Sequence, residues 1–114
     1  YYDENLAYED LDLWVRASRV YEFEYIDAFL VKKRELSTSL SAFFTQRNNA
    51  KTKRLHESSL AILKKAYCLN QTKDEYKALL GRIRFEFYKF LKSKEYLLLF
   101  QLIFLGLKAN WKSL

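Results

Sequence analysis

Residues 96–107 read YLLLFQLIFLGL, and only Gln101 and Gly106 interrupt the apolar run. A surface helix usually has an apolar stripe and a polar face, whereas a helix that is apolar all round is typical of a core. The run is also too short to span a bilayer, which needs about 20 apolar residues. We therefore predict an apolar helix over residues 94–109 that lies at the centre of the fold.

The composition of the whole chain favours helices. Its 114 residues include no proline and two glycines, although the tight turns of β-sandwiches and barrels draw on both. Half of the residues are apolar and 18% are aromatic, which is enough for one hydrophobic core. We predict an all-α, single-domain bundle of four to five helices over residues 1–114. Because the chain starts at Tyr1 and lacks methionine, we expect a processed chain or a piece of a longer protein.

Apolar periodicity predicts two helices in the N-terminal part of the chain. The first covers residues 3–19, with Trp14 as a core anchor. The second covers residues 27–46 and could continue directly from the first. Residues 21–25 alternate between aromatic and acidic residues as a strand does, but no second strand is evident to pair with them. We therefore favour helix there as well.

Two more helices are predicted between these segments and the apolar run. They cover residues 53–69 and 73–92. Thr72 and Glu75 have the spacing of a capping box, which marks the start of the second of these helices. In the apolar run itself we expect Leu99 and Ile103 to be almost fully buried.

The net charge of +6 is unevenly distributed. Residues 1–30 contain eight acidic and two basic residues, whereas residues 31–114 contain six acidic and 18 basic residues. Such asymmetry points to an anionic partner or to an acidic arm that folds onto the basic part. We expect the second arrangement, because Leu6, Leu13 and Trp14 give the acidic arm an apolar stripe that requires burial.

The sequence contains few groups for catalysis or metal binding. His56 is the single histidine and Cys68 the single cysteine, and they lie more than three turns apart on one predicted helix. A zinc site needs four protein ligands, or three and a water. We therefore expect no enzyme and no cofactor, with His56 at the surface and Cys68 as a small buried side chain. The lone cysteine also fits a reducing environment, so we expect an intracellular protein whose compartment is undefined.

These features favour a non-catalytic helical protein-interaction module, such as an accessory or assembly subunit of a larger complex. Its partner would be another protein or a second copy of the chain. Trp111 follows the last predicted helix beside Lys108 and Lys112, so these three are the candidate partner-binding residues. Attachment of the last helix and Trp111 to an anionic membrane surface is a weaker alternative.

The main alternative is an RNA- or DNA-binding module that uses the basic face of residues 47–94. Basic side chains interleaved with aromatic rings can hold a phosphate backbone and stack bases. The candidate phosphate-binding residues are Arg47, Lys51, Lys53, Arg54, Lys64 and Lys65.

Overall fold

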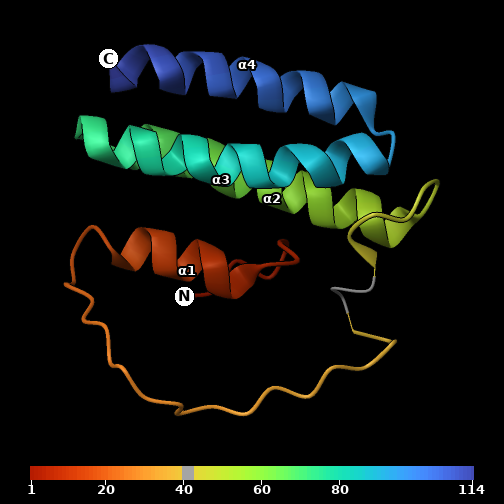
Figure 1. Cartoon of the computed structure of the whole chain (residues 1–114), viewed down its shortest axis with the longest axis horizontal. Coiled ribbons are helices and arrows are strands. Elements are labelled where there is room, and N and C mark those ends of the chain that lie inside the picture. The colour runs from red at the N-terminus through yellow and green to blue at the C-terminus, as the bar shows by residue number, and fades with distance from the viewer. Residues whose placement is uncertain (40–42) are drawn as a thin grey trace.

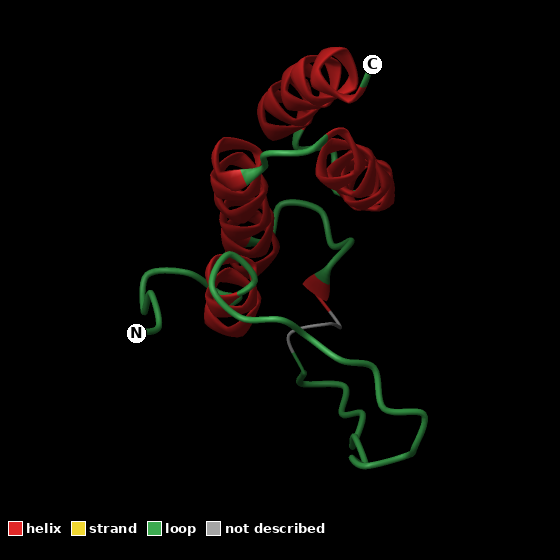
Figure 2. Cartoon of the chain, turned by 90° about the vertical axis from the view of Figure 1, so that its left-hand side faces the viewer, coloured by secondary structure: helices red, strands yellow, loops and turns green. Residues whose placement is uncertain are grey.

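The computed structural model describes residues 1–39 and 43–114 and contains no strand within them. Its four helices are α1 (Glu9–Ala17), α2 (Ala50–Leu69), α3 (Lys73–Lys92) and α4 (Tyr96–Ser113). Figures 1 and 2 show α2 and α3 between α4 at one end of the bundle and α1 at the other. The all-α prediction is confirmed, and the helix count agrees with the expected four to five.

The hydrophobic core lies where α2, α3 and α4 meet. In each of these helices, leucine or isoleucine side chains at helical spacing point toward the other two helices. Phe90 is the largest fully buried side chain. Among the predicted inward residues of these helices, Leu55, Ile62 and Ile83 are buried, whereas Leu91 is exposed. The core residues are Leu60, Leu63, Leu79, Ile83, Phe90, Leu99, Leu102, Leu105 and Ala109.

Side-chain caps fix the starts of α2 and α3. Thr72 Oγ1 accepts a hydrogen bond from the Glu75 amide at 3.3 Å, and Glu75 Oε2 accepts one from the Thr72 amide at 3.1 Å. The capping box is therefore confirmed, and α3 has the predicted bounds. At the start of α2, Asn49 Oδ1 accepts from the Lys51 amide at 2.9 Å. Because Asn49 caps this turn, α2 begins three residues earlier than predicted.

The prediction that helix 94–109 is central is wrong. α4 lies at the edge of the bundle and packs only one side onto α2 and α3 (Figure 2). Leu99 is buried as expected, but Ile103 is 39% exposed. The physical reason is topological, because α1 packs on the far side of α2 and no described segment covers the outer side of α4.

The predicted helix over residues 27–46 is also absent from the described part of that range. Residues 29–36 form an extended, exposed segment, and residues 21–25 are neither helix nor strand. The predicted inward residue Phe29 is fully exposed, whereas Leu40 lies outside the described residues. The serine- and threonine-rich face of this range has weak helix propensity, and its apolar residues have no helix to pack against.

The first helix is shorter than predicted and presents a different face. Trp14, the expected core anchor, is 53% exposed and contacts Phe23 edge-on at 6.0 Å between ring centroids. The position that faces α2 is Asp12, which is fully buried. Leu11 and Val15, one residue before Asp12 and three after it, line the apolar contact with α2 and α3.

Candidate functional site

The outer side of α4 carries a continuous row of large apolar side chains, which we call the outer stripe. Each of its six residues is between 65% and 76% exposed, whereas the buried residues on the inner side of α4 are at most 8% exposed. The outer stripe consists of Leu97, Phe100, Phe104, Leu107 and Trp111 of α4 and of Leu114, the residue directly after the helix. An exposed apolar surface of this length on a small domain is typical of an interaction site.

The three candidate partner-binding residues lie at the C-terminal end of this surface. Trp111 belongs to the last turns of α4, not to a segment beyond the helix, and it is 76% exposed. The Lys108 ammonium lies 5.0 Å from the centre of the Tyr67 ring and 5.5 Å from that of Phe104. Lys112 is exposed in the final turn. Trp111 and Lys108 thus belong to one surface, with the lysine bordering the stripe.

The candidate phosphate-binding residues do not form one basic face, because their side chains turn to different parts of the molecule. Lys65 bonds to Asp12 of α1, whereas Lys64 donates to Gln101 of α4 at 3.1 Å. Arg47 donates to the backbone oxygen of Lys92 at 3.3 Å. These contacts direct Lys64 and Lys65 of α2 to two different neighbouring helices, and Arg47, which precedes α2, to the end of α3.

The remaining three cations also diverge. Lys51 and Arg54 border a hollow whose other walls include acidic residues near the N-terminus, and the Lys51 ammonium lies 4.8 Å from the centre of the Phe43 ring. Lys53 instead borders a shallow pocket at the α3–α4 connection, which Glu95 also lines. Neither group offers a phosphate-binding surface free of nearby carboxylates.

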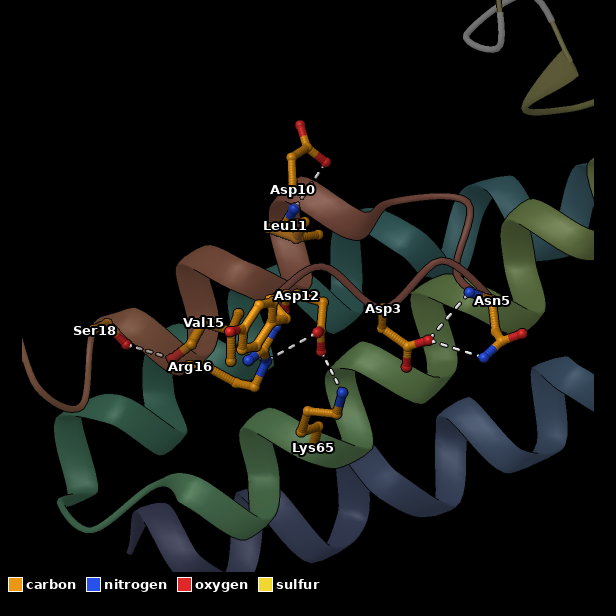
Figure 3. A network of polar contacts seen from close by, with 10 residues as sticks. Asp3, Asn5, Asp10, Leu11, Asp12, Val15, Arg16, Ser18 and Lys65 are labelled. Atoms are coloured by element: carbon orange, nitrogen blue, oxygen red, sulfur yellow. Dashed lines mark hydrogen bonds and ion pairs between the residues drawn. The ribbon is translucent and has the colours of Figure 1, made fainter.

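A buried carboxylate holds α1 against α2. Figure 3 shows Asp12 between Arg16 of its own helix and Lys65 of α2. The Arg16 Nε–Asp12 Oδ2 distance is 3.0 Å, and Lys65 Nζ bonds to Asp12 Oδ1. Burial alone would raise the pKa of the Asp12 carboxyl, but the bonds from Lys65 and Arg16 outweigh it and lower the pKa. The acidic arm therefore packs on the basic part through residues 1–19.

A second ion pair joins the end of α1 to the start of α3. Arg19 Nη2 lies 2.8 Å from Glu75 Oε1. The hydrogen bond from Arg19, together with the backbone amides of Gln71 and Thr72, lowers the pKa of Glu75 to about 2. Glu75 thus caps α3 and anchors α1 at the same time.

His56 is buried, so the expectation of a surface histidine is wrong. Its Nε2 lies 2.9 Å from the Phe44 carbonyl, its Nδ1 lies 3.2 Å from Ser93 Oγ, and its ring stacks on Phe90 at 4.4 Å. Glu95 Oε1 lies 3.6 Å from the same Nδ1. Burial lowers the pKa of His56, and burial raises the pKa of Glu95. A neutral imidazole that donates from Nε2 and accepts at Nδ1 satisfies this geometry.

The prediction that Cys68 is buried is also wrong, because its side chain is exposed on the last turn of α2. Within residues 1–39 and 43–114, no cluster of three or more histidine, cysteine, aspartate or glutamate side chains has an arrangement that could hold a metal ion. In the same residues, no helix is long and apolar enough to cross a membrane. α4 combines its long apolar runs with lysines at its C-terminal end.

Sequence reasoning named Trp111 but missed the rest of the outer stripe. The signal was present, since the six residues recur at alternating spacings of three and four along residues 97–114. It was hidden by the second apolar row on the inner side of the same helix. Comparisons with protein-family models, with curated proteins and with solved structures found no match.

Proposed function

We propose that this chain is a non-catalytic helical interaction module that binds a protein partner through the outer stripe of α4. The observation that carries the proposal is the exposure of six large apolar side chains in one unbroken row. Aromatic side chains such as those of Phe104 and Trp111 are enriched in the cores of protein interfaces. An assembly or accessory role in a larger complex fits such a module.

The buried cluster around His56 supports a structural role over a catalytic one. A nucleophile must reach its substrate, and the Ser93 hydroxyl beside the imidazole is 3% exposed. Its oxygen also lies 3.1 Å from the Phe90 carbonyl, which competes with His56 Nδ1 for the single hydroxyl proton. The contact between Ser93 and His56 therefore joins the end of α3 to α2.

The contacts of the basic residues weigh against the nucleic-acid alternative. Phosphate binding gains from several cations along one surface. Here Lys65 pairs with Asp12, and Arg19 pairs with Glu75. The remaining cations of α2 lie on different sides of that helix.

The test compares the wild-type protein with Phe104→Glu and with Phe29→Glu. Phe104 belongs to the outer stripe, whereas Phe29 is a fully exposed phenylalanine, which makes it a matched control. The segment of residues 29–36 lies on the opposite side of the molecule from α4 (Figure 1). Association with protein, whether with other proteins or with itself, should be lost in Phe104→Glu and kept in Phe29→Glu. Helix content by circular dichroism should be unchanged in both variants.

Binding of a labelled single-stranded oligonucleotide at two salt concentrations completes the test. We expect weak binding, because the cations do not share a surface. Sub-micromolar binding with a steep salt dependence, unaffected by Phe104→Glu, would contradict the proposal and favour the nucleic-acid module.

A further inference from the structure

The outer stripe has the spacing of a coiled-coil seam, in which apolar residues alternate at intervals of three and four. From Leu97 to Leu114 the intervals are three, four, three, four and three, so the pattern reads the same in both directions. A seam with this symmetry is complementary to itself in antiparallel orientation. We propose that the outer stripe binds the outer stripe of a second copy of this chain, antiparallel, about a two-fold axis between Leu105 and Gly106. This inference rests on the proposed function and names its partner.

In this arrangement each residue of the stripe meets an apolar residue of the second copy. The pairs are Leu97 with Leu114, Phe100 with Trp111, and Phe104 with Leu107. Every pair occurs twice, once on each side of the axis, as a two-fold symmetric interface requires. No residue of the stripe is left without an apolar neighbour.

The charges at the ends of α4 favour the antiparallel over the parallel orientation. Lys108 and Lys112 lie at the C-terminal end, so parallel helices would bring the lysines of the two copies together. Antiparallel helices place the two Lys112 residues near opposite ends of the seam, leave the two Lys108 residues five positions apart beside the axis, and oppose the two helix dipoles. The antiparallel orientation is therefore favoured by the helix dipoles and by the separation of the two Lys112 charges, while the Lys108 ammonium lies over the Tyr67 and Phe104 rings of its own chain.

The positions that border the seam are nearly free of charge. With Leu97, Phe104 and Trp111 at the first core position of each heptad, the flanking residues are Tyr96, Gln101, Ile103, Lys108 and Asn110. Lys108 is the one charged residue in this set, and its ammonium already lies over the rings of Tyr67 and Phe104. Since flanking charges usually choose the partner of a coiled coil, this border permits a second copy with the same net charge.

The size of the surface also fits a dimer. A fully exposed aromatic side chain offers about 150–250 Å². With three leucines added and each residue at its observed exposure, the stripe offers on the order of 800 Å², the usual contribution of one partner to a stable interface. The accessible surface of the chain is 8907 Å², whereas a compact monomer of this mass exposes about 6,600 Å². The outer stripe and the extended segment before α2 are the two visible sources of this excess.

Sedimentation equilibrium of the wild-type protein provides the first test, over concentrations up to about 0.1 mM. We expect the mass of a dimer. Phe104→Glu places a carboxylate next to the axis in both copies and should weaken the dimer on the order of a hundredfold or more. Phe29→Glu, with the same chemical change on a remote segment, should remain a dimer.

The orientation is tested by disulfide cross-linking in a Cys68→Ser background, which removes the native exposed thiol. Leu97→Cys mixed with Leu114→Cys should cross-link, because these positions meet across the antiparallel seam. Leu97→Cys alone should remain uncross-linked, because the two copies of residue 97 then lie at opposite ends. Cross-linking of Leu97→Cys with itself would overturn the antiparallel arrangement.

A wild-type chain that is monomeric across this concentration range would overturn the pairing of two copies. The proposed function is judged separately, by whether Phe104→Glu loses a different captured protein that Phe29→Glu retains. If that protein is lost, the stripe binds another partner and only the second copy is excluded. If the wild-type chain is monomeric and Phe104→Glu also keeps every captured protein, both the pairing of two copies and the proposed function are wrong.

Discussion

Residues 50–113 and residues 20–39 are both rich in large apolar side chains, yet only the first region packs them. In α2, α3 and α4 the apolar residues recur at helical spacing, and three such stripes enclose a common core. In residues 20–39 equally large side chains such as Tyr25, Phe29 and Val31 stand almost fully exposed. Apolar content alone therefore does not bury a segment, because burial requires a second stripe in reach.

The same lesson applies within α4. Its inner residues pack on α2 and α3, while its outer stripe finds no counterpart among the described residues. The two sides of α4 are both apolar, and they differ in what lies opposite to them. Substitutions in each region should therefore distinguish packed from unpacked apolar residues, and α1 from the core helices.

The largest effect is expected for Leu102→Ala in the core. Leu102 is fully buried, so its truncation should lower the free energy of unfolding by about 2–5 kcal/mol through lost burial and a cavity. Phe29→Ala, in the exposed region, should change it by less than about 0.5 kcal/mol. Chemical denaturation of both variants measures the difference. Equal losses would show that residues 20–39 are packed in solution.

A smaller loss is expected for Asp12→Ala, which removes the buried contact between α1 and α2. The free energy of unfolding should fall by about 1–3 kcal/mol, below the range for a fully buried ion pair because Arg16 and Lys65 remain over one-third exposed. Asp10→Ala, an exposed change in the same helix, is the control. Hydrogen exchange should become faster in α1 while α3 and α4 stay protected. Uniformly faster exchange in all helices would show that α1 belongs to the core.

Removal of the capping box should have a lesser effect within the well-packed region. Thr72→Ala is expected to lower the free energy of unfolding by about 0.5–2 kcal/mol, and Thr72→Ser, which keeps the hydroxyl, should restore most of it. Because Glu75 also binds Arg19, which follows α1, part of this destabilisation should come from weaker packing of α1. A neutral Thr72→Ala variant would show that the first turn of α3 is held by other contacts.

The pH dependence of His56 is a finer test of the core. Burial lowers the pKa of His56 below its ordinary value of 6.5, so the unfolded chain binds a proton more readily than the folded one. Its stabilising effect is thus complete above about pH 6.5 and is lost as the pH falls from there to the lowered folded pKa. His56→Gln should lack this component. The burial that lowers the pKa of Lys89 and raises the pKa of Glu95 is present in both proteins. A difference in unfolding free energy that is flat with pH would contradict the buried imidazole.

The sequence predicted the core helices well because their signals are local. The capping box and the apolar period defined α3 from end to end, and the same period placed Leu55, Ile62 and Leu63 inward. The bounds of α1 and its face were predicted less well, because the pairing of Asp12 with Lys65 joins residues far apart in the chain. A carboxylate in the contact face cannot be distinguished from a solvent-exposed one by local pattern alone.

The position of the candidate site was predicted only at its end, at Trp111. The burial of His56 depends on Phe44 and Ser93, which reach it from other segments. The exposure of the outer stripe depends on what packs against α4, and the described residues of the range 27–46 form no α-helix that could cover it. Both are consequences of tertiary arrangement, which a period of apolar residues does not define.

The short link between α3 and α4 bears on the order in which the helices assemble. Residues 93–95 join these helices in a tight turn with Lys94 in the left-handed region, at φ 58°. Residues 18–49, by contrast, separate α1 from its docking surface on α2 and α3. Because contacts close in sequence form fastest, we expect α3 and α4 to pair early and α1 to dock late. During synthesis α1 leaves the ribosome before the helices on which it docks, so its packing must wait until they have been made.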